Sequence, residues 1–307
     1  MFEEKVTIGE GTKYPLNGML TIPNGDNHQF PAVVLVQGSG PSNMDAKVGN
    51  NTPFKDIADG LTEKGIAVLR YDKRTFVYGK VMKNDVSMSV KEETIEDAIH
   101  AVNLLRKHPK IDPNKIFIIG HSFGGMLAPR IDAEGGDFAG IIIMAGSPRK
   151  LEEIMMSQNE TLINSLNKFL RWIAKKQVAA FSKKFENLYT MTDDEAKAKK
   201  LFGGVRAYYF KEMGDHPASE YLTKLEKPIF ILQGEKDFQA TIKDDFESYK
   251  EILYHKENVT YKLYPNLNHL FMPSVYGEIM KVKKEYSVPQ KVDKQVIEDI
   301  ADWILAN

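Results

Sequence analysis

Cysteine is absent from this chain of 307 residues. Its absence excludes disulfide bonds, metal sites built on thiolates and a cysteine nucleophile. An excess of positive charge is missing as well, because the formal net charge at pH 7 is −1. The composition therefore gives no sign of the basic surface with which proteins bind nucleic acid, and we expect no such partner.

Long apolar segments are also missing. The longest strongly apolar run, FAGIIIMAG at residues 138–146, is far shorter than the roughly 20 residues that a membrane-spanning helix needs. The first residues, MFEEKVTIGEG, are acidic and lack the apolar core of a secretory signal peptide. We therefore expect no membrane partner and a cytoplasmic location. The 42% of hydrophobic residues suffices for one large core.

Short runs rich in valine and isoleucine recur from residue 32 onward. Such runs are typical of strands that are buried on both faces of a parallel sheet. They are AVVLV (32–36), GIAVLRY (65–71), KIFIIG (115–120), GIIIMAG (140–146) and PIFILQG (228–234). VTYKLY (259–264) is a further predicted strand near the C-terminus. Residues 5–9 and 16–23 alternate instead, and predict antiparallel edge strands ahead of the parallel ones.

Amphipathic stretches separate these runs. Helices are expected within residues 52–65, 93–108, 243–256 and 292–305, the first with Thr52 as N-cap. Strand and helix in alternation predict a mostly parallel, doubly wound α/β sheet.

Residues 148–222 break this alternation, because they contain no strand-like run. They predict a helical cap inserted into a core made of residues 1–147 and 223–307. Apolar side chains of the cap either line a pocket or form the contact between cap and core. They are Met155, Met156, Phe169, Trp172, Tyr208, Tyr209 and Phe210, of which Trp172, Tyr208 and Tyr209 are the candidate substrate contacts.

The stretch GHSFGG, residues 120–125, lies between a predicted strand and a predicted helix. Its pattern, Gly120-x-Ser122-x-Gly124, is that of a nucleophile elbow, in which a tight turn presents a serine hydroxyl at the end of a sheet. A serine that merely caps an ordinary helix is the alternative. The strand before and the helix after favour the nucleophile.

A serine nucleophile needs a base that is oriented by an acid, and in this topology they follow in the order serine, acid, histidine. Asp237, just after the run PIFILQG, is the candidate acid, and Glu235 is the alternative. His269 follows the last strand-like run and is the candidate base. His255 is the other histidine downstream of the acid, but it ends a helical stretch.

Donors for an oxyanion are expected from two backbone N–H groups. One belongs to Phe123, the residue after the nucleophile, and the other to Ser39 in the stretch QGSGP, where glycines let the backbone turn inward. A phosphate-binding loop is the alternative for this stretch. It lacks the spacing GxGxxG or GxxxxGK[ST], so we expect no nucleotide.

Ser122, Asp237 and His269, in that order and with QGSGP upstream, resemble the α/β-hydrolase superfamily over essentially the whole chain. The stretches GSGP, PFKDIADGLTEKGIAVLRYDKR and GHSFGG resemble bacterial carboxylesterases of the dienelactone-hydrolase-like and acylaminoacyl-peptidase-like type, with cinnamoyl esterases as near relatives. This resemblance implies a cap after the sixth strand, and neither metal nor organic cofactor.

One departure concerns Gln37, because the family usually has a histidine there that supports the oxyanion loop. Glutamine can also donate and accept hydrogen bonds, so we expect the loop to keep its shape. Gln37 and His121 are further candidate pocket residues. Asp72, Lys73 and Arg74 either hold an anionic substrate group or fix their loop through ion pairs, and the second interpretation is favoured.

The sequence thus predicts a serine hydrolase that cleaves small to medium carboxylic esters through an acyl-enzyme. A peptidase or thioesterase with the same triad is the alternative, and a non-catalytic binding protein on this scaffold is a further one. A small-molecule ester is the expected partner. Whether identical chains assemble is left open.

Overall fold

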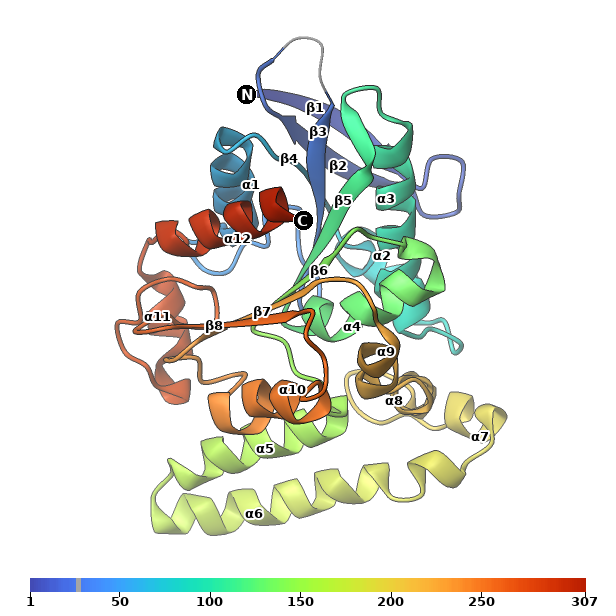
Figure 1. Ribbon diagram of the computed structural model, residues 1–307. Helices are drawn as coiled ribbons and strands as arrows, with labels where there is room; N and C mark the ends of the chain where they lie inside the picture. Colours follow the sequence, from blue (N-terminus) through green and yellow to red (C-terminus); the bar gives the residue numbers. More distant parts are fainter. Residues whose placement is uncertain (26–28) are drawn as a thin grey trace.

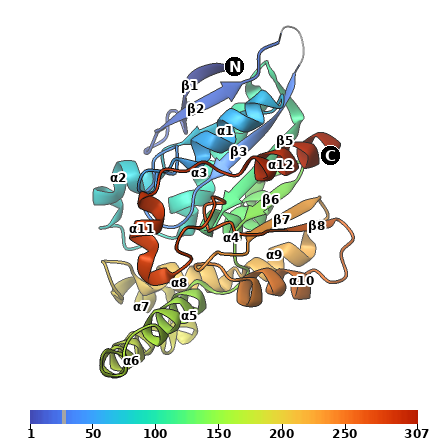
Figure 2. The same cartoon turned by 90° about the vertical axis from the view of Figure 1, so that its left-hand side faces the viewer.

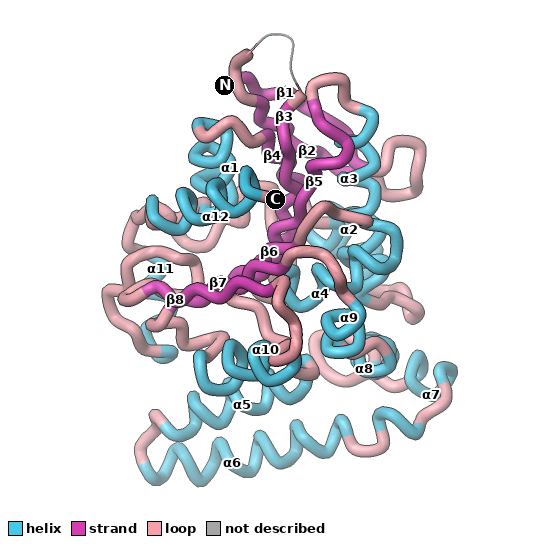
Figure 3. The backbone as a smooth tube through the Cα atoms, in the orientation of Figure 1, coloured by secondary structure: helices cyan, strands magenta, loops and turns pink. Residues whose placement is uncertain are grey.

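The computed structural model describes residues 1–25 and 29–307. In these residues one sheet of eight strands, in the order β1-β2-β4-β3-β5-β6-β7-β8, runs through the middle of the molecule (Figures 1 and 3). The strands are β1 (Phe2–Ile8), β2 (Leu16–Ile22), β3 (Phe30–Val36), β4 (Ala67–Tyr71), β5 (Ile111–His121), β6 (Ile141–Met144), β7 (Ile229–Gly234) and β8 (Val259–Tyr264).

Strand directions follow the sequence patterns. β1 and β2 are antiparallel, β2 is antiparallel to β4, and all pairs from β4 to β8 are parallel. The prediction that both N-terminal strands lie at an edge is wrong for β2, which lies between β1 and β4. β2 pairs with β1 on one side and with β4 on the other, so most of its residues are buried like those of the parallel strands.

Helices cover both faces of the sheet. The helices outside the insertion are α1 (Pro53–Glu63), α2 (Arg74–Met82), α3 (Glu96–Lys107), α4 (Phe123–Ile131), α10 (Glu247–Ile252), α11 (Val282–Ser287) and α12 (Lys294–Ala306). α1 and α12 pack on one face with Val33 and Leu35, while α3 and α4 pack on the other with Val34 and Val36. Successive residues of β3 thus belong to two separate hydrophobic cores, one on each face of the sheet. For this reason every position of the strand can be apolar.

Two details differ from the sequence prediction. Thr52 precedes α1 as expected, but its side chain makes no capping hydrogen bond. The sequence does not indicate α2, because its residues show no clear apolar period. It places residues 74–82 beside the carboxyl ends of the strands instead of leaving them as a loop.

The insertion between β6 and β7 consists of helices in the described residues. They are α5 (Leu151–Asn164), α6 (Lys168–Ser182), α7 (Asp193–Ala198), α8 (Ala207–Asp215) and α9 (Ala218–Lys224). Figures 1 and 2 show α5 to α8 together at one end of the molecule, with α6 outermost. We call this segment the cap; its domain boundaries at residues 148 and 222 stay a prediction. No helix of the described residues is long and apolar enough to cross a bilayer.

The turn from β5 into α4 is unusually tight. Ser122 has φ 56° and ψ −116°, a conformation that costs a non-glycine residue energy. A Cβ atom on Gly120 would lie 2.3 Å from the carbonyl oxygen of Gly124, and one on Gly124 would lie 2.3 Å from that of Val36. Both neighbours are backbone atoms that cannot yield, so these two positions need glycine.

Gly124→Ala should therefore destabilise the fold by about 1–3 kcal/mol or more, as overpacking does. Thermal unfolding followed by circular dichroism measures the effect. Gly79→Ala is the control, because a Cβ there meets no atom within 4 Å and alanine favours helix. Equal melting temperatures for Gly124→Ala and the unmodified protein would contradict this account of the turn.

Candidate active site

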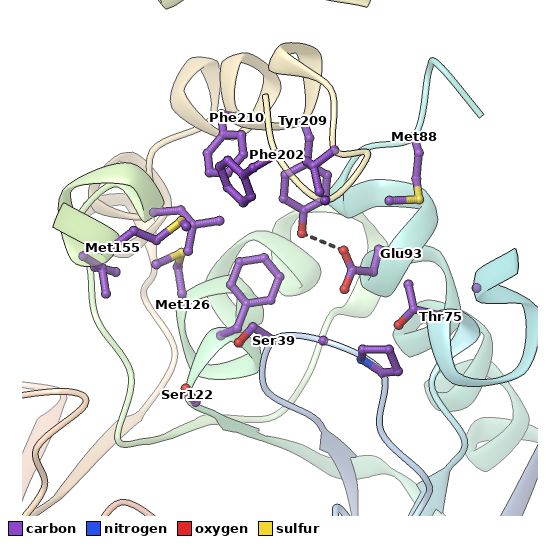
Figure 4. Close-up of a pocket in the computed structure, with 18 of the residues that line it drawn as sticks. Ser39, Thr75, Met88, Glu93, Ser122, Met126, Met155, Phe202, Tyr209 and Phe210 are labelled. Carbon is purple, nitrogen blue, oxygen red and sulfur yellow. Dashed lines mark hydrogen bonds between the residues drawn. The ribbon is translucent and has the colours of Figure 1, made fainter. Parts of the chain in front are cut away.

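A cavity of about 630 Å³ lies between the carboxyl ends of the strands and the cap. Ser122 and Ser39 lie on its floor, and Phe202, Tyr209 and Phe210 of the cap lie above them (Figure 4). His269 lines it too. The fold thus brings together residues from the turn after β5, the loop after β3 and the loop after β8.

Asp237 and His269 form a buried pair. His269 Nδ1 lies 2.7 Å from Asp237 Oδ2, and the two residues are 5% and 8% exposed. Asp237 also accepts hydrogen bonds from the side chain of Gln233 and from the N–H groups of Gln239 and Ala240. These donors fix the position of the carboxylate. Because Nδ1 of His269 is bound to Asp237, Nε2 is the ring nitrogen that can accept a proton. Glu235 is exposed, and only Asp237 of the two candidates contacts the histidine.

The Ser122 hydroxyl faces the same cavity as His269. In the described part of the chain it makes no side-chain hydrogen bond. An ideal Cβ on Gly38 would lie 3.7 Å from Ser122 Oγ, so the glycine keeps the space around the hydroxyl open. Catalytic contacts between serine and histidine are often long before substrate binds, and rotation about χ1 can close them.

Two backbone N–H groups near Ser122 are available as donors. In the described residues, the N–H groups of Ser39 and Phe123 donate to no protein acceptor, and both residues line the cavity. Phe123 begins α4, where the first N–H groups of a helix have no partner within it. This is the arrangement that an oxyanion hole requires.

The loop after β3 is supported from behind. Gln37 is buried and its side-chain amide donates to the carbonyl of Tyr71 at the end of β4. Gln37 does not line the cavity, so its predicted contact with substrate is not what the structure shows; it supports the loop instead.

His121 lies behind His269. Its Nε2 is 2.8 Å from the carbonyl oxygen of His269, and the two ring centroids are 4.8 Å apart. Burial, together with the imidazole of His269, lowers the pKa of His121 from 6.5 to about 4. It is therefore neutral near pH 7, does not line the cavity, and packs against the loop that carries His269.

The residues after β4 make ion pairs. Arg74 binds the carboxylates of Asp97 and Glu96, and Lys73 binds Glu93. Burial raises the pKa of Asp97 to about 6, although Arg74 opposes the shift. Asp72 accepts the N–H of Met44. All three candidate anion-binding residues are engaged inside the protein, as the favoured interpretation expects.

Only part of the predicted cap contacts reach the cavity. Met155, Tyr209 and Phe210 line it, whereas Tyr208, Trp172, Met156 and Phe169 do not. Trp172 lies on α6, which packs outside α5, and it is 59% exposed beneath the ammonium group of Lys176. The ring of Tyr208 is covered by Lys197. Helical spacing alone could not tell the inner from the outer side of the cap.

Several lining residues were missed in the sequence. Figure 4 shows Thr75, Met88 and Glu93 on one side of the cavity and Met126 near Ser122. Thr75 belongs to helix α2, which the sequence does not indicate, and Glu93 is the first residue of the segment 93–108 in which a helix is expected. Met126 follows Ser122 by one helical turn, which was a usable signal. Among the described residues, no group of three or more His, Asp or Glu side chains is placed to hold a metal ion.

Comparison with known proteins shows the family of this chain. Residues 51–273 match the model of the Hydrolase_4 family, described as serine aminopeptidase, S33. The chain belongs to this family. The esterase EstD of Thermotoga maritima, a relative, is 37% identical over 305 residues, which are 99% of this chain and 68% of that protein.

Comparison with solved structures shows the fold of this chain. Est1E from Butyrivibrio proteoclasticus superposes with a TM-score of 0.58 at 15% identity and 99% coverage of both chains. The Pyrococcus furiosus esterase Pf2001 gives 0.57 at 15% identity, with 99% of this chain and 91% of that chain covered. The α/β-hydrolase fold predicted from the sequence is thus confirmed.

The low pKa of His121 makes stability depend on pH. Between about pH 6.5 and pH 4 the unfolded chain binds a proton at this residue and the folded protein does not, so stability falls as the pH falls. The free energy of unfolding should therefore fall between pH 7 and pH 5. We expect this fall to be smaller in His121→Gln by on the order of 2 kcal/mol.

Urea unfolding at the two pH values measures this loss. His255→Gln, at an exposed histidine, is the control and should keep the loss of the unmodified protein. If His121→Gln lost as much stability between the two pH values as the control, the imidazole of His121 would not be the source.

Proposed function

We propose that the protein is a serine hydrolase of carboxylic esters, with Ser122 as nucleophile, His269 as base and Asp237 as the acid that orients it. The observation that carries the proposal is the buried Asp237–His269 pair, which shares a cavity with a strained, accessible Ser122. Membership of a serine hydrolase family and a relative named esterase support the same reaction.

The mechanism follows from these positions. The free Nε2 of His269 takes the proton of Ser122 as its oxygen attacks the ester carbonyl, and Asp237 stabilises the resulting imidazolium. The N–H groups of Ser39 and Phe123 hold the oxyanion. His269 then returns the proton to the leaving alcohol, and water releases the acid through the same steps.

The strain at Ser122 contributes to this chemistry. The strained turn places Ser122 at the cavity and directly before the N-terminus of α4. The positive end of the helix dipole favours the negative charge that develops during attack.

The cavity favours uncharged acyl and alcohol groups of small to medium size. Much of its wall is apolar: Met82, Met88, Met126, Leu151, Ile154, Met155, Phe202 and Phe210. The cap closes it from above, which limits the length of substrate that fits. We also propose the cytoplasm as the compartment, and small-molecule esters as the partners.

The family description, serine aminopeptidase, makes an aminoacyl substrate the second candidate. Such a substrate carries an ammonium group and needs a free carboxylate. Among the described lining residues the carboxylates are Glu93 and Asp85. Glu93 is engaged by Lys73 and Tyr209. Asp85 is exposed, so solvent and salt screen its attraction for an ammonium group. The ester is therefore favoured over the aminoacyl amide.

Turnover of model substrates tests this ranking. We expect p-nitrophenyl esters of short and medium chain length, or methyl ferulate, to be hydrolysed much faster than acyl-CoA or aminoacyl anilides. A fluorophosphonate should add once to the protein and not to Ser122→Ala, as read by intact-mass spectrometry. Fast cleavage of anilides without ester hydrolysis would support the peptidase instead, and an adduct on Ser122→Ala would refute the nucleophile.

Replacement of the acid gives a second test. Asp237→Asn should lower kcat by a factor on the order of 10³ or more, because the histidine loses its orientation and the charge that stabilises it. Glu235→Gln is the matched control and should leave kcat nearly unchanged, since that side chain is exposed. The reverse ranking in steady-state assays would assign the role to Glu235.

A further inference from the structure

A chain of buried polar contacts runs from the cap to the oxyanion loop. The hydroxyl of Tyr209, on α8, donates to Glu93 Oε2 at 2.6 Å (Figure 4). Glu93 Oε1 lies 2.7 Å from Lys73 Nζ, and Lys73 Nζ donates to the carbonyl oxygen of Gly38 at 2.9 Å. Tyr209, Glu93 and Lys73 therefore form a chain of contacts, and its last member, Lys73, binds the peptide group between Gly38 and Ser39.

That peptide group also carries the N–H of Ser39. A trans peptide is planar, and its C=O and N–H bonds point in opposite directions. When Lys73 holds the carbonyl of Gly38, it also holds the Ser39 N–H pointing away from Lys73. Ser39 lines the cavity, and this N–H has no protein acceptor in the described residues.

Lys73 touches the second oxyanion residue as well. Its ammonium nitrogen lies 5.6 Å from the centroid of the Phe123 ring, within the range of a cation–π contact. One buried cation thus contacts both residues whose N–H groups face the developing charge.

The contacts are protected from water. The side chains of Lys73 and Glu93 are 2% and 7% exposed. Burial and the carboxylate of Glu93 raise the pKa of Tyr209 well above its usual range, so the phenol stays a donor. When one partner of a buried polar network is removed, the remaining polar groups lack a hydrogen-bond partner. The position of the Gly38–Ser39 peptide group would then no longer be fixed.

The neighbouring ion pair serves a different purpose. Arg74 binds Asp97 and Glu96 and so ties α2 to α3. In the described residues its side chain donates no hydrogen bond to the oxyanion loop. Lys73 alone of the two basic residues binds a main-chain oxygen of that loop. The sequence neighbours differ in role because successive side chains leave the chain in different directions.

We propose that Lys73, Glu93 and Tyr209 are positioning residues that hold the Ser39 N–H in place for the oxyanion, so that docking of α8 completes the oxyanion hole. The proposal rests on the esterase function proposed above. It makes the cap part of the catalytic geometry in addition to closing the cavity.

Tyr209→Phe tests the proposal, because it removes one hydroxyl and keeps the ring. We expect kcat to fall about tenfold, less than the 10²–10³ that loss of a whole oxyanion donor costs, with KM little changed. Affinity for an arylboronic acid, which forms a tetrahedral adduct on the serine, should fall by a similar factor. Glu93→Gln should act in the same direction and more strongly.

Tyr189→Phe is the matched control. Tyr189 also lies in the cap and donates its hydroxyl to a carboxylate, that of Glu152, but it does not line the cavity. It should keep both kcat and boronic acid affinity. Thermal unfolding of each variant shows whether the fold is retained.

The outcomes separate the inference from the function. An active protein whose Tyr209→Phe variant keeps kcat and boronic acid affinity overturns the inference and leaves the esterase function standing. A rise in KM alone also overturns it, because Tyr209 would then only contact substrate. An unmodified protein that neither cleaves esters nor reacts with a fluorophosphonate overturns both.

Discussion

The close approach of backbone to backbone at the turn after β5 is the constraint on which the site depends. Gly120 packs against Gly124, and Gly124 packs against Val36 of the neighbouring strand, at distances that leave no room for a Cβ atom. This packing forces Ser122 into a positive φ. The strained residue is stable only because β3, β5 and α4 fix it from three sides. The same packing brings the loop after β3 next to Ser122, so the proposed nucleophile and the proposed oxyanion donors lie close together.

Around this point the charges are paired before substrate arrives. Asp237 is bound by His269 and by three N–H donors, and Glu93 by Lys73 and Tyr209. A buried carboxylate without partners would be protonated or would pull water into the site. Because the partners are present, both carboxylates can be buried beside a largely apolar cavity. An apolar cavity strengthens the few hydrogen bonds that act on the reacting ester.

The cap has two sides with different chemistry. Its inner side, formed by α5, residues 202–206 and α8, closes the cavity with methionine and aromatic side chains. Its outer helix, α6, exposes Phe169 and Trp172 to solvent. The cap residues that line the cavity with Ser122 therefore belong to the inner side, and the contact between Tyr209 and Glu93 joins that side to the core.

Much of the site could be predicted from the sequence, because the features concerned are local. The glycines stand within two residues of Ser122 in the sequence, and the parallel strands are marked by their own apolar runs. The order of Ser122, Asp237 and His269 follows from where those runs end, since the carboxyl ends of parallel strands meet at one edge.

What only the tertiary structure decided are contacts between distant segments. Tyr209 and Glu93 are 116 positions apart, and helical spacing could not tell that Tyr209 points into the cavity while Tyr208 and Trp172 do not. The low pKa of His121 and the bond from Lys73 to Gly38 likewise arise from neighbours that the chain brings together only on folding. A sequence pattern records which side of a helix is apolar, but the burial and partners of one side chain depend on which element packs against that side.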